Sequence, residues 1–313
     1  MAEADPEDPH LRAPLAHLAG RAPPAPDWFR RAIETPHERA TVTVEGARIE
    51  WLAWGEPDRP GLLLLHGNGA HADWWRFTAP FLSRTHRVAA LSWSGMGGSD
   101  HRPRYSIDLF VEESLAVARA AGLGARFAAV GHSFGGFPLM ALASRPNTPL
   151  ARAIILDTPF DPGDRRPRRS RGDPRPHRVY PTLEAALARF RYAPVQPCPN
   201  LFITDFIARH SLRQVAGGWT WRFDPFLWRG FTRPQTGDLL TAPRCPVALL
   251  WGERSSLMPE PLLASMAARL PPGTPRIPIP DAGHHVMADQ PLALVAALRA
   301  LLALDGERAR DSA

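Results

Sequence analysis

Short apolar runs alternate with segments of helical periodicity along most of the chain. The apolar runs are nearly continuous, as expected for strands buried on both faces of a sheet. They cover residues 61–67, 87–93, 126–133, 151–157 and 245–252. Helical segments lie between or after them, over residues 73–83, 107–122, 134–145, 259–270 and 291–304, with a further strand at 276–281. This alternation predicts an α/β fold with one doubly wound, mostly parallel sheet.

The N-terminal part of the chain has a different pattern. Residues 1–26 are rich in proline and alanine, and we expect them to form a flexible leader. Residues 28–34 predict a short helix with Asp27 as its N-cap. Apolar and polar residues then alternate on both sides of Glu45-Gly46, which predicts two antiparallel strands joined by a turn at this dipeptide.

The strand–helix alternation stops for about 80 residues in the second half of the chain. Residues 158–240 are rich in proline, arginine and aromatic residues, with helical periodicity at 182–190 and 201–211. We interpret this segment as a mainly helical cap inserted after a central strand. The predicted core then consists of residues 27–157 and 241–313.

Composition restricts the class of protein. Hydrophobic residues make up 44% and charged residues 22% of the chain, as in globular proteins. No apolar run approaches the roughly 18–20 residues that a membrane-spanning helix needs. The N-terminus lacks the basic and then apolar pattern of a secretion signal. We therefore expect a cytoplasmic protein without a membrane span.

The basic charge of the chain is concentrated in one segment. Residues 163–178 contain seven arginines and two aspartates, a net charge of +5, while the whole chain has +6. A solvated, proline-rich loop explains this segment best. An anion-attracting rim near the mouth of an active site is the first alternative, and a nucleic-acid footprint is the weakest. We expect no nucleic-acid partner.

The cysteines argue against a disulfide framework and a structural zinc site. Cys198 and Cys245 are the only two, and no Cys/His cluster in the sequence has zinc-ligand spacing. Cys245 begins an apolar strand, where burial as a small hydrophobic side chain is expected. We predict that the protein uses neither a metal nor an organic cofactor.

The motif GHSFGG, residues 131–136, has the form G-x-S-x-G at the junction of a buried strand and a helix. In this context the serine occupies a sharp turn and its hydroxyl projects above the edge of the sheet. Gly131 and Gly135 leave room for the strained turn. The motif predicts that Ser133 is a nucleophile.

An acyl-transferring serine also needs hydrogen-bond donors for the oxyanion that forms on the substrate. One predicted donor is the backbone N–H of Phe134, directly after the nucleophile. The second is the backbone N–H of Asn68, in the loop HGNG after an apolar strand. We expect His66 in the same loop to hold the loop in place rather than to carry a proton.

Several motifs in order, HGNG, SGMGGSD, GHSFGG, WGE and AGHH…DQP, resemble those of the α/β-hydrolase fold superfamily over roughly residues 40–303. The resemblance implies an eight-stranded, mostly parallel sheet with the cap after the sixth strand. It also implies Ser133 as nucleophile and His284, rather than His285, as general base. Haloalkane dehalogenases and epoxide hydrolases of this superfamily have aspartate in place of Ser133, which argues against their chemistries here.

The carboxylate that should orient the histidine is missing from its usual place. By the resemblance that place is Ser255, which holds no charge. Some members of the superfamily have the acid at the end of the preceding strand, where this chain has Asp157. We predict that Asp157 is the acid. The alternatives are that Asp157 only stabilises the turn into the cap, that Glu253 is the acid, or that the site has none.

These residues together predict a serine hydrolase that cleaves a carboxylic ester through an acyl-enzyme. Aromatic residues of the cap favour a medium-sized, partly apolar small molecule as substrate. Hydrolysis of a lactone, an amide or a carbon–carbon bond by the same residues remains open. A ligand-binding protein that has lost turnover is the alternative from another class. The sequence fixes neither the substrate nor the oligomeric state.

Overall fold

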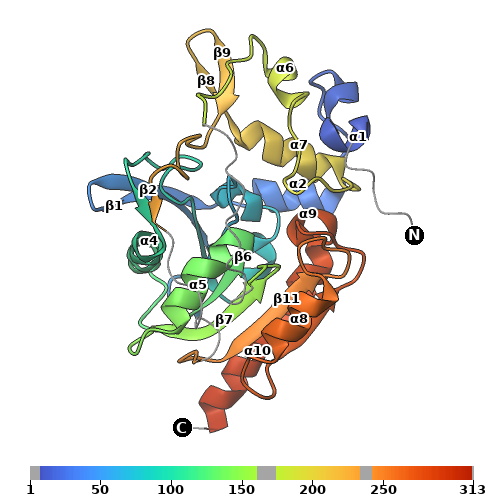
Figure 1. Cartoon of the computed structure of the whole chain (residues 1–313). Coiled ribbons are helices and arrows are strands. Elements are labelled where there is room, and N and C mark those ends of the chain that lie inside the picture. Colours follow the sequence, from blue (N-terminus) through green and yellow to red (C-terminus); the bar gives the residue numbers. More distant parts are fainter. Residues whose placement is uncertain (1–7, 161–173, 233–241, 312–313) are drawn as a thin grey trace.

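A computed structural model describes residues 8–160, 174–232 and 242–311 of the chain. It contains one eight-stranded sheet with helices packed against it (Figure 1). The strand order is β1-β2-β4-β3-β6-β7-β11-β12, in which the β1–β2 and β2–β4 pairs are antiparallel and the remaining pairs are parallel. The strands are β1 (Glu38–Val44), β2 (Ala47–Trp54), β3 (Gly61–Leu65), β4 (Arg87–Leu91), β6 (Phe127–His132), β7 (Leu150–Leu156), β11 (Val247–Gly252) and β12 (Arg276–Ile279). The predicted fold class is confirmed.

The continuous apolar runs are explained by burial on both faces of the central strands. Every residue of β3, β4 and β6 is buried. Successive side chains of a strand point to opposite faces. Leu62 and Leu64 accordingly belong to one hydrophobic cluster, whereas Leu63 and Leu65 belong to the cluster on the other face.

Helices cover both faces of the sheet (Figure 1). They are α2 (Asp27–Glu34), α3 (Ala79–Leu82), α4 (Ile107–Ala120), α5 (Gly136–Ala143), α8 (Glu260–Ala267), α9 (Val286–Asp289) and α10 (Pro291–Asp311). The helix predicted for residues 73–83 is instead a 3₁₀ turn, Ala72–Trp75, followed by α3. Pro80 explains the break, because proline has no N–H for a continuing helix but fits the first turn of a new one. Asp27 is the first helical residue of α2, and Pro26 rather than Asp27 is the N-cap.

The chain between β7 and β11, hereafter the insert, departs from the strand–helix alternation. Its described elements are α6 (Leu183–Leu187), α7 (Leu201–His210), β8 (Leu212–Val215), β9 (Gly218–Trp221) and β10 (Phe231–Thr232), which pairs with β5 (Tyr105–Ser106). The β8–β9 hairpin was not predicted from sequence. It turns at Gly217 and Gly218, both with positive φ. The insert follows the sixth strand of the main sheet, but its limits at residues 158 and 240 remain a prediction.

The expectation of a flexible leader is wrong for residues 8–26. This segment contains α1 (Pro9–Arg12) and a 3₁₀ turn, Ala16–Leu18. Leu15 is only 2% exposed and belongs to the same hydrophobic cluster as residues of α7. Arg209 of α7 donates a hydrogen bond to the Gly20 carbonyl. Burial of a few apolar side chains therefore orders residues 8–26 despite their proline- and alanine-rich composition. Residues 1–7 lie outside the described part.

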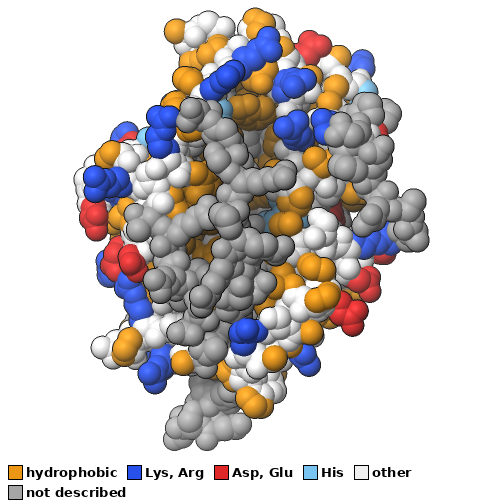
Figure 2. All heavy atoms as spheres, viewed as in Figure 1, with side chains coloured by type: hydrophobic (Ala, Val, Ile, Leu, Met, Phe, Trp, Pro, Cys, Tyr) orange, Lys and Arg blue, Asp and Glu red, His pale blue; other side chains and the backbone are white. Residues whose placement is uncertain are grey.

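The predicted arginine loop covers residues 163–178, and most of it, residues 163–173, lies outside the described residues. Among the described residues of the insert, arginines are exposed at positions 178, 189, 191 and 213. Figure 2 shows basic side chains gathered over the end of the molecule where the insert lies. Among the helices of the described part, none is both long and apolar enough to cross a bilayer.

The packing of residues 8–26 gives a testable prediction. Leu15→Ala should lower the free energy of unfolding by about 2–5 kcal/mol, because it leaves a cavity in the core. Urea denaturation at equilibrium measures this change. His17→Ala, two residues away and exposed, is the matched control and should change stability by less than about 0.5 kcal/mol. Equal effects of the two substitutions would contradict the packing of this segment.

Candidate active site

Ser133 lies at the sharp turn between β6 and α5. Its φ is 52°, a left-handed value that is unfavourable for a residue with a side chain. The backbone is crowded on both sides of it. A Cβ on Gly131 would lie 2.6 Å from the Gly135 carbonyl oxygen, and a Cβ on Gly135 would lie 2.6 Å from the His66 carbonyl oxygen. Only glycine fits at these two positions, so the motif holds the serine in its strained conformation.

The structure brings the predicted nucleophile, base and acid into one chain of hydrogen bonds. The Nε2 atom of His284 is 2.9 Å from the hydroxyl oxygen of Ser133. Its Nδ1 atom is 2.6 Å from Oδ1 of Asp157. Because a carboxylate only accepts hydrogen bonds, Nδ1 carries the proton and the lone pair of Nε2 faces the serine. This tautomer can accept the hydroxyl proton of Ser133.

Asp157 is fully buried, directly after β7, and β7 lies between β6 and β11. Its carboxylate accepts three hydrogen bonds. The backbone N–H of Gly252 donates to Oδ2 at 2.7 Å, and Oδ1 accepts both from His284 and from the Ser255 hydroxyl at 2.7 Å. Glu253 is exposed and accepts only a long hydrogen bond from the Asp281 N–H. The geometry therefore supports Asp157 and argues against Glu253 as the carboxylate that meets His284.

Ser255 has a role that the sequence analysis missed. It occupies the usual place of the acid, and its side chain still points to the histidine's partner atom. A hydroxyl can donate a hydrogen bond, whereas a second carboxylate there would repel Asp157. Ser255 thus stabilises the negative charge of Asp157.

The loop that contains Asn68 lies against the nucleophile. A Cβ on Gly67 would lie 3.1 Å from the Cβ of Ser133. Asn68 is exposed, and Phe134 is buried directly after the serine. The hydroxyl of Thr158, next to Asp157, donates to the Ser133 carbonyl at 3.0 Å and so fixes the turn from the other side. Gly67, the residue before Asn68, and Phe134, the residue after the serine, therefore both adjoin Ser133.

His66 holds its loop in place, as expected. Its Nδ1 atom bonds the Gly67 carbonyl, and its Nε2 atom accepts from the Trp93 backbone N–H. Burial lowers the pKa of His66 to about 3. A ring that stays neutral and has both nitrogens bonded is not available to carry a substrate proton.

The loop around His284 is anchored to the insert by a set of hydrogen bonds that the sequence did not reveal. The side-chain oxygen of Gln196 accepts from the His285 backbone N–H at 2.9 Å. The side-chain nitrogen of Gln196 donates to Oδ2 of Asp289 at 2.8 Å, and the Gly283 N–H donates to the same oxygen at 2.7 Å. The backbone N–H groups on both sides of His284 are thus fixed by Gln196 and Asp289.

His132 and the consecutive residues His284 and His285 meet beside Ser133, although about 150 positions separate them in the sequence. The ring centroids of His132 and His284 are 4.9 Å apart, and those of His284 and His285 are 4.8 Å apart. Burial, and then the neighbouring His284, hold the pKa values of His132 and His285 well below the ordinary value. Both rings are therefore neutral near pH 7.

Aromatic side chains surround Phe134 on the side of the insert. Phe110, Trp228 and Phe231 pack against its ring at 5.4–5.8 Å between centroids. Trp228 is 41% exposed, so this apolar group reaches the surface near the nucleophile.

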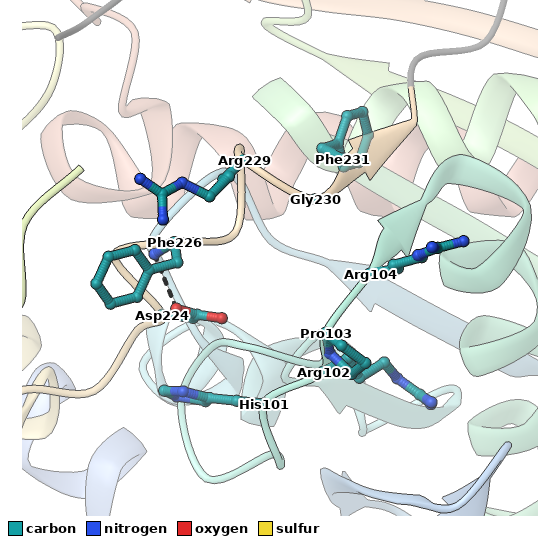
Figure 3. Close-up of a pocket in the computed structure, with 9 residues that line it drawn as sticks. All are labelled: His101, Arg102, Pro103, Arg104, Asp224, Phe226, Arg229, Gly230 and Phe231. Carbon is teal, nitrogen blue, oxygen red and sulfur yellow. Dashed lines mark hydrogen bonds between the residues drawn. The ribbon is translucent and has the colours of Figure 1, made fainter. Parts of the chain in front are cut away.

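An open pocket of about 750 Å³ adjoins this group, and Phe231 lines it. Figure 3 shows its lining segments, residues 101–104 and 224–231. Ser133, Asp157 and His284 do not line it. Arg102 lines the pocket, but its guanidinium donates its hydrogen bonds to the Glu113 side chain and to the backbone carbonyls of residues 44 and 45. The pocket therefore lies beside the aromatic group and is distinct from the three hydrogen-bonded residues of the candidate site.

Comparison with known proteins matches residues 62–298 to the model described as "Alpha/beta hydrolase family". The matched segment begins in β3 and ends in α10. It includes every residue of the hydrogen-bonded chain described above.

Individual relatives are distant. Epoxide hydrolase 3 of Xenopus tropicalis is 27% identical over 152 residues, which are 47% of this chain and 41% of that protein. The chain thus spans less than half of that relative's length. Esterase Rv0045c of Mycobacterium tuberculosis is 26% identical over 266 residues, 83% of this chain and 88% of that protein. The thioesterase domain from the curacin biosynthetic pathway has the same fold, with a TM-score of 0.72 at 22% identity over 84% of this chain and 99% of that domain.

The raised pKa of Asp289 predicts that the stability of the folded protein depends on pH. Burial of Asp289 raises the pKa of its carboxyl group from 3.8 to about 7, so the folded protein binds this proton more tightly than the unfolded chain does. The resulting stabilisation is complete below pH 4 and is lost as the pH rises to 7. Relative to Asp289→Asn, the wild type should lose about 1–3 kcal/mol of stability over this range. Urea denaturation at several pH values measures both proteins, and parallel pH curves would contradict the raised pKa.

Proposed function

Since the chain belongs to the alpha/beta hydrolase family, we propose that it is a serine hydrolase that cleaves a carboxylic ester through an acyl-enzyme. The observation that carries this proposal is the continuous hydrogen-bonded chain Ser133–His284–Asp157. In it the nucleophile, its base and the group that orients the base stand in the order that acyl transfer requires.

The proposed reaction has two halves. Ser133 attacks the carbonyl carbon of the ester while His284 takes the hydroxyl proton, and the oxyanion is held by the backbone N–H groups of Asn68 and Phe134. The protonated His284, stabilised by Asp157, gives its proton to the departing alcohol. Water then enters, loses a proton to His284 and releases the acid from Ser133 by the same path in reverse.

Serine at position 133 favours acyl transfer over the opening of an epoxide. Attack of a hydroxyl on an epoxide carbon leaves an ether on the protein, and an ether has no carbonyl at which water could release it. An ester intermediate has such a carbonyl. The similarity to epoxide hydrolase 3 therefore supports the family, whereas the nucleophile supports ester hydrolysis.

The substrate we propose is a medium-sized small molecule with an apolar portion. The support is the aromatic group around Phe134, which includes the exposed Trp228. The insert would then act as a cap over this region. Lactones and amides carry the same reacting carbonyl, so they are the nearest alternative substrates.

The nucleophile is tested by Ser133→Ala. We expect the variant to lose hydrolysis of p-nitrophenyl butyrate and labelling by a fluorophosphonate probe, because both need the Ser133 oxygen. Ser256→Ala, an exposed serine at the surface, is the matched control and should retain both. A Ser133→Ala protein with a normal melting curve and full turnover would refute the proposed mechanism.

The acid is tested by Asp157→Asn. We expect kcat to fall by about 10⁴-fold, because the amide cannot stabilise the protonated His284 and can select the wrong tautomer. Ser255→Ala keeps the carboxylate but removes one of its donors, so its loss of kcat should be much smaller. Glu253→Gln should have kcat close to the wild type.

A double variant separates loss of the acid from loss of folding. Ser255→Asp in the Asp157→Asn background returns a carboxylate to within reach of the same histidine nitrogen, and part of kcat should be restored. If Asp157→Asn alone folds normally and keeps its kcat, Asp157 is not the acid.

A further inference from the structure

The cluster of His132, His284 and His285 has the composition and spacing of a metal-binding group. One ring nitrogen of each histidine lies within 4.8 Å of one from each of the others. Imidazole nitrogens are good ligands for Zn²⁺, Cu²⁺ and Ni²⁺. A tetrahedral Zn²⁺ ion with Zn–N bonds of 2.0–2.1 Å needs nitrogens about 3.3 Å apart, so the rings must rotate inward to bind it.

Two of the three rings have nitrogens that satisfy no other group. His132 donates from Nε2 to the His284 carbonyl at 2.9 Å, and among the described residues its Nδ1 atom has no hydrogen-bond partner. Within the same described ranges, neither ring nitrogen of His285 has a partner in hydrogen-bond geometry, although the nearby backbone carbonyl of Ala193 acts to raise its pKa. These rings are 1% and 6% exposed. Buried polar atoms are nearly always paired, so unpaired nitrogens at this place point to a ligand.

The third ring is already oriented as a metal ligand. A histidine that binds a metal through one nitrogen typically donates from the other nitrogen to a carboxylate. Asp157 accepts such a hydrogen bond from Nδ1 of His284, which leaves the Nε2 lone pair free for a metal. Ser133, which now bonds this nitrogen, is partly exposed, so an ion can reach the cluster by the path of the substrate.

We propose that His132, His284 and His285 bind a divalent transition-metal ion of the zinc class, and that the bound ion switches the enzyme off. The ion takes the Nε2 lone pair of His284, and Ser133 then has no base. Metal binding and proton transfer from Ser133 thus require the same lone pair of His284. The effect on turnover rests on the proposed function, whereas metal binding itself does not.

Binding is tested with Co²⁺, whose visible absorption intensifies when nitrogen ligands surround it in a tetrahedral site. Titration of the wild-type protein should give this spectrum, and one equivalent of Zn²⁺ should abolish it. His285→Phe and His285→Asn each remove one ligand, so the dissociation constant should rise at least 10-fold. Two variants are used because the larger phenyl ring can overpack the space beside Trp74 and Tyr192, at 5.4 and 4.6 Å. His101→Ala, an exposed histidine, is the control and should bind Co²⁺ like the wild type.

Inhibition is measured separately on p-nitrophenyl butyrate. Zn²⁺ should inhibit the wild type and His101→Ala, and EDTA should restore their activity. The His285 variants, each compared with its own rate without metal, should need at least 10-fold more Zn²⁺. Absence of a Co²⁺ spectrum in the wild type, or equal Zn²⁺ sensitivity in folded His285 variants, would overturn the site. A protein that binds Co²⁺ but does not hydrolyse esters would refute the proposed function and leave the site intact.

Discussion

The buried carboxylate of Asp157 imposes the central constraint on this molecule. A fully buried carboxylate is costly unless hydrogen-bond donors surround it. Here the donors come from three places: the end of β11, the loop after β11 and the loop before α9. Each is brought to Asp157 because β7 lies between β6 and β11. The position of one charged group therefore connects the end of β11, His284 and, through His284, Ser133.

The site is also linked to the insert. Gln196 bonds the backbone next to His284 and the carboxyl of Asp289, and Asn200 donates to the carbonyls of residues 288 and 289. The histidine loop thus depends on residues that lie about 90 positions earlier in the chain. A shift of this part of the insert would therefore move His284 relative to Ser133 and Asp157.

Features with a local cause were predictable from the sequence. Continuous apolar runs such as residues 61–65 identified the buried strands, and the glycines around Ser133 identified the turn. Features that depend on contacts between distant segments were not. The burial of Leu15, the donation from Ser255 to Asp157 and the bonds of Gln196 need the folded structure, because no local pattern records their partners. The histidine cluster also depends on contacts between distant segments. Positions 132, 284 and 285 have no zinc-ligand spacing in the sequence, and their rings meet only because the fold places the end of β6 beside the loop that contains His284.

The pairing of Asp157 with Ser255 also bears on how sequences of this kind are sorted. The side chains of Asp157, directly after β7, and of Ser255, in the loop after β11, approach to 2.7 Å, and only one of them needs to carry the charge. A screen that demands an acid at the position of Ser255 would discard this chain as a degenerate copy. A screen that asks which carboxylate can contact the histidine would keep it. Contact with the histidine is thus decided by a location in the fold, and a side chain can reach that location from more than one position in the sequence.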